Sequence, residues 1–152
     1  MKSKQYTIHE MELVYLPNYK ISDKPILKSS TAVYELLYEI YNLNTIRCQE
    51  EFIVIYLNNS NRVIGTQKIS KGGINATVVD TRLILGTALK SLSTGIIISH
   101  NHPSGNREPS ENDKQLTSKL KNACNLLDIK LLDHIIVTPD DGYFSFADDS
   151  LL

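Results

Sequence analysis

The chain has 152 residues, of which 41% are hydrophobic and 22% are charged, and its formal net charge is −1. This length and composition predict one globular domain with a sizeable core, and the near-neutral charge argues against the broad basic surface of a nucleic-acid-binding protein. No apolar run reaches the roughly 18 residues of a membrane span and no apolar signal core follows the first residues, so we expect a cytoplasmic protein without membrane contact.

The first half of the chain predicts one helix and two strands, after a short N-terminal strand at residues 11–16. The helix starts at Ser29 or Ser30, because apolar residues then recur at helical spacing and either serine can cap it. Those apolar residues are Val33, Leu36, Leu37, Ile40 and Tyr41. Residues 50–57 predict an interior strand, since both of its alternating faces are apolar, and residues 62–69 predict a strand that forms a hairpin with it.

Helices and strands alternate in the second half of the chain. The predicted elements are a short edge strand at 76–79, a helix that starts near Asp80, a buried strand at 96–98, a helix at 110–127, and strands at 129–138 and 143–146. The order β-β-α-β-α-β-β predicts an α/β fold in which a mixed sheet is sandwiched by helices. Two distant cysteines, Cys48 and Cys124, are expected to be inert structural thiols, with Cys124 buried on the apolar stripe of its helix.

The stretch from Ser99 to Asp113 concentrates possible metal ligands at the end of the buried strand 96–98. His100 and His102 point the same way because strand side chains alternate between faces, and two imidazoles roughly 6–7 Å apart along the strand can close on one metal ion. A turn rich in proline and glycine then leads into the next helix, which places Asp113 in its first turn. Two histidines and one carboxylate with an open fourth position form the pattern of catalytic zinc sites.

Water bound to zinc has a pKa lowered to about 7, but it still needs a base that takes its proton. Glu50 and Glu51 stand at the head of the interior strand, and alternation sends only one of them toward the site. The chemistry of the residues leaves open which of the two it is.

Ordinary structural explanations also exist for Ser110, Asp113 and His134. Ser110 and Asp113 have the spacing of a helix capping box, which stabilises a helix by about 1 kcal/mol. The Ser110 hydroxyl can cap the helix and face the metal site at the same time. His134 lies inside an apolar strand, where it is either a buried histidine bonded to a backbone carbonyl or a residue that supports the metal ligands from behind.

A glutamate followed by His-x-His-x7-Ser-x2-Asp resembles the signature of the JAMM (MPN-type) metalloproteases. In this chain the pattern is filled by Glu50, His100, His102, Ser110 and Asp113. The resemblance implies one Zn²⁺ per chain, held by the two histidines and the aspartate, with water as the fourth ligand. It also implies that the glutamate is the general acid and base, and that the serine polarises the substrate carbonyl or holds the oxyanion.

The sequence around this signature is similar to the RadC family over roughly residues 45–150. The motifs are His-Asn-His-Pro-Ser-Gly at 100–105, Leu-Leu-Asp-His-Ile-Ile-Val at 131–137, Phe-Ser-Phe at 144–146, and Glu50-x-Phe52-x-Val54-x-x-Leu57 followed by Asn61-Arg62-Val63. The Glu-x-Phe register selects Glu50 over Glu51. The resemblance implies a RadC-like JAB/MPN metal-binding domain of the cytidine-deaminase-like type at residues 46–152, on which residues 1–45 pack as a strand and helix extension.

Three functions follow as hypotheses. The first is a zinc-dependent hydrolase that cleaves a peptide or isopeptide bond, with an edge strand near residues 62–79 holding an extended peptide or protein substrate. The second is a DNA-repair-associated or mobile-DNA-associated protein of the RadC family that binds or processes nucleic acid, for which the net charge gives no support. The third is an interaction scaffold, with or without a metal. The physiological substrate and the oligomeric state stay open.

Overall fold

The computed structural model describes residues 20–72, 79–140 and 142–152. The predicted strand at residues 11–16 and residues 76–78 of the predicted edge strand lie outside these ranges. Val79, the described residue of that edge strand, is not in a strand. None of the helices within these ranges has the length and hydropathy that crossing a membrane requires.

A five-stranded sheet forms the centre of the described chain, with the strand order β2-β1-β3-β4-β5. The strands are β1 (Glu51–Leu57), β2 (Val63–Lys71), β3 (Gly95–Asn101), β4 (Lys130–Thr138) and β5 (Gly142–Ser145). The neighbours β3 and β4 run parallel, and the other neighbouring pairs run antiparallel. The predicted mixed sheet and the predicted hairpin of β1 with β2 are therefore confirmed.

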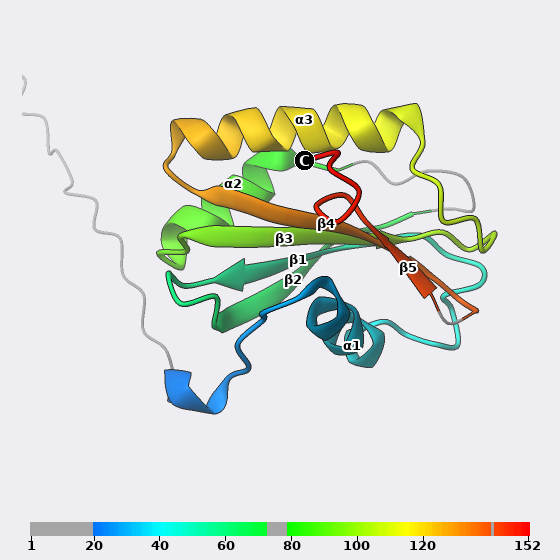
Figure 1. Cartoon of the computed structure of the whole chain (residues 1–152), viewed down its shortest axis with the longest axis horizontal. Coiled ribbons are helices and arrows are strands. Elements are labelled where there is room, and N and C mark those ends of the chain that lie inside the picture. The colour runs from blue at the N-terminus through cyan, green and yellow to red at the C-terminus, as the bar shows by residue number, and fades with distance from the viewer. Residues whose placement is uncertain (1–19, 73–78, 141) are drawn as a thin grey trace, which may run out of the picture.

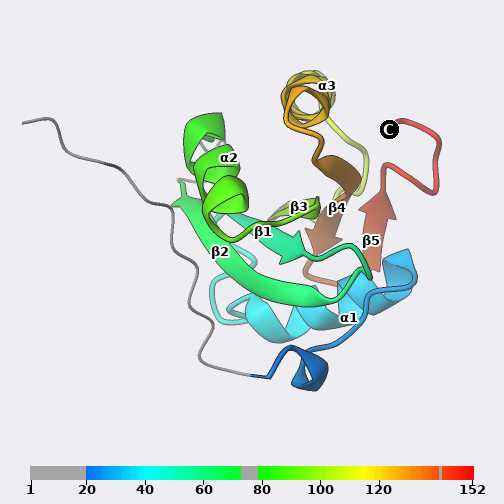
Figure 2. The same ribbon diagram turned by 90° about the vertical axis from the view of Figure 1, so that its left-hand side faces the viewer.

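Within the described residues, three α-helices cover the sheet, namely α1 (Ser30–Ile40), α2 (Thr81–Lys90) and α3 (Glu111–Leu126), and a short 3-10 helix, η1 (Ile21–Asp23), precedes them. Helix α1 lies against one face of the sheet, whereas α2 and α3 lie against the other (Figure 1 and Figure 2). Each α-helix begins after a residue whose side-chain oxygen accepts a backbone hydrogen bond: Ser29, Asp80 and Ser110. The predicted helix starts and the α/β class are thereby confirmed.

Alternation along the strands divides the core into two layers. In β1, Ile53 packs in the layer with α1, whereas Phe52 and Val54 pack in the layer with α2 and α3. All residues of β1 and β3 are buried, which confirms that both are interior strands. Since Ile98 of β3 belongs to the layer under α2 and α3, His100 two positions later faces the same side.

Helix α1 shares a core with the sheet. Its residues Val33 and Leu37 are buried in the same cluster as Ile53 of β1. The division into an extension at residues 1–45 and a domain at residues 46–152 stays a prediction.

The two cysteines are free. Cys124 is buried as expected, whereas Cys48 is exposed, which departs from the prediction of an inert structural thiol. Burial raises the pKa of the Cys124 thiol to about 11, so it holds little reactive thiolate near neutral pH. We expect Ellman's reagent to modify only Cys48 in the native chain, and both thiols after unfolding. The Cys48→Ser variant is the control and should give no native signal; equal reaction rates of the two native thiols would contradict the buried position of Cys124.

Candidate metal centre

Three side chains of the kind that bind metals meet where β3 ends and α3 begins. His100 Nε2 lies 2.9 Å from His102 Nε2 and 3.1 Å from Asp113 Oδ1, and His102 Nε2 lies 3.5 Å from Asp113 Oδ2. Together the side chains form a group that could hold a metal ion. The structure thus brings together the three residues that the sequence predicts as ligands.

The path of the chain between β3 and α3 produces this meeting. His102 extends the direction of β3, because its backbone N–H donates to the Val137 carbonyl of β4 at 2.9 Å. Gly105 adopts a positive φ of 80°, which glycine tolerates without strain, and its N–H donates back to the His102 carbonyl. The chain then reaches Ser110, the N-cap of α3, and Asp113 falls in the first turn of the helix beside the imidazoles.

The predicted capping box is present, and it engages only one of the two carboxylate oxygens of Asp113. Asp113 Oδ2 accepts hydrogen bonds from the N–H and the O–H of Ser110, both at 2.7 Å, while Ser110 Oγ accepts from the Asp113 N–H at 3.2 Å. The other oxygen, Oδ1, is the one nearest to His100. Asp113 therefore caps α3 and completes the candidate ligand group at once.

Neutral His102 has one tautomer in this structure. Its Nδ1 lies 2.7 Å from the carbonyl oxygen of Asn106, and a carbonyl can only accept, so Nδ1 carries the proton and Nε2 keeps its lone pair. That lone pair faces the second imidazole and the Asp113 carboxylate, an arrangement that a shared cation stabilises.

The spacing of the three atoms fits zinc. A tetrahedral zinc ion with ligand bonds of about 2.0–2.2 Å holds its ligand atoms about 3.3–3.6 Å apart. The imidazole nitrogens lie 2.9 Å apart, His100 Nε2 lies 3.1 Å from Asp113 Oδ1, and the ligand atoms of the group all lie within 4.8 Å of one another, so small shifts of the side chains would seat the ion.

Burial and pairing shift the pKa values of Asp113 and His102 in opposite directions. Burial raises the pKa of the Asp113 carboxyl, but the neighbouring imidazoles of His100 and His102 and the hydroxyl of Ser110 outweigh burial and hold that pKa well below its usual range. Burial lowers the pKa of His102, but hydrogen bonds to Asp113 and Asn106 outweigh burial. The pKa of His102 therefore lies above the ordinary value of 6.5. Asp113 is ionised at neutral pH, and a proton on His102 competes with a metal ion for Nε2.

We expect the affinity for zinc to fall on acidification, from a higher pH than an unperturbed histidine would give. The reason is that the raised pKa of His102 lets a proton occupy Nε2 before the pH reaches 6.5. Zinc titrations against a competing chelator at stepwise lower pH measure this, with the chelator's own protonation corrected. An affinity that stays constant through neutral pH would contradict the pairing of His102 with Asp113.

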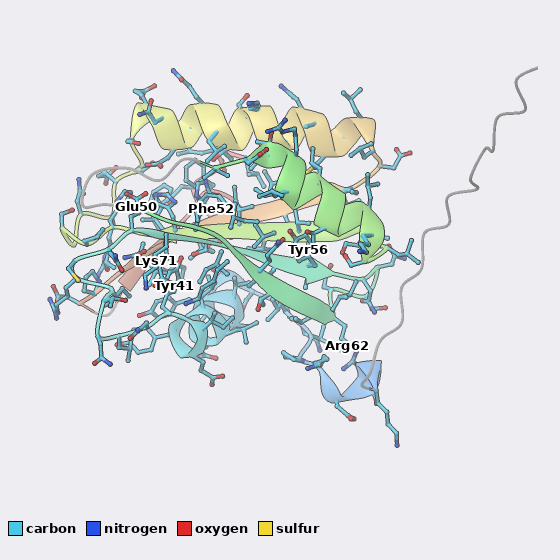
Figure 3. The ribbon with its side chains drawn as sticks, turned by 180° about the vertical axis from the view of Figure 1, so that it is seen from behind. Tyr41, Glu50, Phe52, Tyr56, Arg62 and Lys71 are labelled. Atoms are coloured by element: carbon cyan, nitrogen blue, oxygen red, sulfur yellow. The ribbon has the colours of Figure 1, made fainter. Side chains whose placement is uncertain are left out.

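An open cavity of about 500 Å³ lies over the ligand group and has Glu50, Phe52 and Ser110 in its lining. Glu50 precedes β1 and has the same alternation as Phe52, so both side chains lie on the α3 side of the sheet, opposite Tyr41 (Figure 3). Ser110 is exposed at the wall of the cavity. The structure thus places both predicted catalytic residues beside the candidate ligands.

Glu51 points to the other face of the sheet. Its carboxylate is 3% exposed and pairs with Lys68 Nζ of β2 at 2.8 Å. The backbone N–H of Glu51 is held by Asn101 Oδ1 at 2.7 Å. The alternation prediction that only one of the two glutamates faces the site is therefore confirmed, and it is Glu50.

The charge of the cavity wall is negative. Its described lining carries Glu50, Glu108 and Asp113, and no lysine or arginine belongs to that described lining. Without a bound cation, a polyanionic substrate would therefore meet like charge at this wall.

His134 does not bond a backbone carbonyl with its ring, so that interpretation is wrong. Its Nε2 lies 2.8 Å from His100 Nδ1 and its Nδ1 lies 2.6 Å from Thr117 Oγ1. Complete burial lowers the pKa of His134 well below 6.5, so the ring is neutral. His134 supports a candidate ligand from behind, the alternative that the sequence left open.

Two further residues of the site region escaped the sequence analysis. Asn101, between the two histidines, uses its side-chain amide to donate to the carbonyls of Ile46 and Gln49 at 2.9 and 2.8 Å, and so ties the segment before β1 to β3. Thr117 lies one helical turn after Asp113. The signals were available: an asparagine inside a buried strand must find partners, and a threonine four residues after a ligand lies on the same helix face.

A family model described as "RadC-like JAB domain" matches residues 27–151. Among curated relatives, a UPF0758 protein of Flavobacterium johnsoniae is 51% identical over 102 residues, which are 67% of this chain and 44% of that protein. UPF0758 proteins of Porphyromonas gingivalis and Actinobacillus pleuropneumoniae are 47% and 48% identical over 104 and 101 residues, 68% and 66% of this chain and 46% of each relative. The chain therefore spans less than half the length of these relatives.

Proposed function

This chain belongs to the RadC-like JAB domain family, and from that premise we propose that it is a zinc-dependent hydrolase that cleaves a peptide or isopeptide bond. The observation that carries the proposal is the convergence of His100 Nε2, His102 Nε2 and an Asp113 carboxylate oxygen in one cavity with Glu50. Three protein ligands that leave a position open are typical of catalytic rather than structural zinc sites.

The two imidazole Nε2 atoms and Asp113 Oδ1 would hold the ion, because these atoms face one another while their other polar atoms are engaged elsewhere. When bound, zinc supplies Lewis-acid polarisation of a carbonyl and lowers the pKa of a coordinated water to about 7. The remaining chemistry belongs to side chains of this chain.

Glu50 would act as general base and then as general acid. Its carboxylate takes a proton from the attacking water and later gives it to the leaving amine, a role that contributes about 10²–10⁴-fold to a rate. The Ser110 hydroxyl would donate to the substrate carbonyl oxygen, exchanging its present hydrogen bond to Asp113 Oδ2 for one to the developing oxyanion. Strand β2 forms one edge of the sheet, and its last residue, Lys71, pairs with Glu51 of β1. We propose that an extended peptide substrate pairs with β2.

The family name equally admits the nucleic-acid-processing alternative, but the described cavity argues against it. Phosphodiester chains are bound mainly through lysine and arginine contacts to phosphate, and the described lining of this cavity contains carboxylates instead. An amide carries no charge at the bond to be broken, so an acidic wall does not repel it.

The test is to load the chain with zinc and incubate it with a proteome-derived peptide library and with a library of lysine-linked isopeptides, reading cleavage by mass spectrometry. We expect cleavage that stops when a chelator removes the metal and returns when zinc is restored. A chain that binds zinc and leaves both libraries intact would favour the scaffold function. Salt-dependent binding or cutting of DNA by the same preparation would favour the nucleic-acid alternative.

A further inference from the structure

A buried hydrogen-bond chain runs behind the metal-facing side of His100. His100 Nδ1 lies 2.8 Å from His134 Nε2, His134 Nδ1 lies 2.6 Å from Thr117 Oγ1, and the Thr117 hydroxyl donates to the Asp113 carbonyl oxygen at 2.6 Å. The three residues His100, His134 and Thr117 are at most 2% exposed. The hydrogen-bond chain therefore starts at one candidate ligand and ends at the backbone of another.

The acceptor at the Asp113 end fixes the direction of every proton. A carbonyl oxygen only accepts, so the single hydroxyl proton of Thr117 points to Asp113. Thr117 Oγ1 must then accept from His134 Nδ1–H, which leaves His134 Nε2 as an acceptor. His134 Nε2 accepts from His100 Nδ1–H, and His100 Nε2 is left with its lone pair toward Asp113 and His102.

Aromatic rings hold His134 in this orientation. The Phe146 ring stacks on the imidazole with centroids 4.6 Å apart and an interplanar angle of 14°, and the Phe52 ring lies 6.2 Å away at 58°. These rings offer no strong hydrogen-bond partner. Among the described residues, the partners recorded for the His134 ring nitrogens are His100 and Thr117.

We infer that Thr117 and His134 are positioning residues that set the tautomer of His100 and so keep its Nε2 available to a metal ion. The inference rests on the metal-binding part of the proposed function and is independent of hydrolysis. Residues behind a metal-bound histidine commonly fix its tautomer and ring orientation. Here the group that decides the tautomer is a threonine hydroxyl two hydrogen bonds away from His100.

Removing that hydroxyl has a defined consequence. Without an acceptor at Nδ1, His134 can place its proton on Nε2 and donate to His100 Nδ1. His100 must then carry its own proton on Nε2, where it blocks the metal. A change at Thr117, which does not belong to the candidate ligand group, is therefore expected to weaken metal binding.

The experiment compares the whole chain with Thr117→Val, which keeps the shape and removes the hydroxyl, and Thr117→Ser, which restores it. Zinc affinity is measured by competition with a chromophoric chelator, and long-range nitrogen–proton correlation spectra of the metal-free protein at alkaline pH identify the tautomer of His100. We expect Thr117→Val to lower zinc affinity by about 10–100-fold and to populate the Nε2–H tautomer of His100. Thr117→Ser should return both readouts toward the wild type.

Thr138→Val is the matched control, because Thr138 is buried and its hydroxyl also donates to a backbone carbonyl, that of Gly142, outside the ligand group. Equal weakening by Thr138→Val, or unchanged affinity and tautomer in Thr117→Val, would overturn the inference. So would a wild-type chain with the proton on His100 Nε2, a measurement that needs no variant. If the wild type binds no zinc, the proposed function fails, while the tautomer spectra still decide the inference.

Discussion

His102→Ala is expected to lower the affinity of the chain for zinc by roughly 10³-fold. One of three ligands carries about a third of a binding free energy that is on the order of 10–16 kcal/mol for protein zinc sites, and every 1.4 kcal/mol is a factor of about ten. His102 is the better choice for this test because its side chain is 17% exposed, against 2% for that of His100. Its truncation opens no cavity in the core.

Glu108→Gln is the control for this variant. Glu108 contributes a carboxylate to the same cavity but is not part of the ligand group. The zinc affinity of the Glu108→Gln variant should therefore stay within about twofold of the wild type, as expected for a charge that is screened at the surface. Both variants are measured by zinc competition, with circular dichroism to show that the fold is kept. Wild-type affinity in His102→Ala would remove the metal centre from consideration.

Glu50→Gln is expected to lower turnover of a cleaved peptide by about 10²–10⁴-fold while zinc still binds. Glutamine has nearly the shape of glutamate but cannot accept and return a proton, so the loss measures the acid–base contribution. Turnover is followed with the best substrate from the peptide libraries, and bound zinc is counted in the same samples.

The neighbouring substitution Glu51→Gln is the matched control, since it removes an equivalent carboxylate from the opposite face of β1. It should keep turnover near the wild-type level, although it loses the contact with Lys68 and therefore some stability. Full activity in Glu50→Gln together with inactivity in Glu51→Gln would transfer the acid–base role to Glu51 and contradict the geometry.

The sequence predicted those parts of the fold that depend on a local pattern of apolar and polar residues. Apolar side chains on both faces of residues 50–57 can be satisfied only inside a sheet, and β1 lies there with every residue buried. Alternation then placed Glu50 with Phe52 and His100 with Ile98. The observed bounds of β1 and α3 differ from the predicted bounds by one residue at each affected end, where fraying and caps blur any assignment.

The residues that support His100 from behind could not be predicted from the sequence, because their contacts join residues that are distant in the chain. His134 and His100 are 34 residues apart, and their contact follows from the parallel register that pairs Ile98 with His134. No local pattern specifies that register. The sequence showed that His134 needed a partner, whereas the β3–β4 register supplies the histidine partner and the packing of α3 on β4 supplies Thr117.

The tether made by Asn101 has a consequence for how the site assembles. The candidate metal ligands all lie between residues 100 and 113, within a single strand–turn–helix unit. The segment that carries Glu50 is held beside them by contacts between residues about 50 apart, because Asn101 bonds Ile46, Gln49 and Glu51 and β1 pairs with β3. Closing a longer loop costs more chain entropy. The proposed ligand group therefore closes a short loop of the chain, whereas the placement of Glu50 beside it closes a long one, so we expect loss of the β1–β3 pairing to displace Glu50 from the ligands.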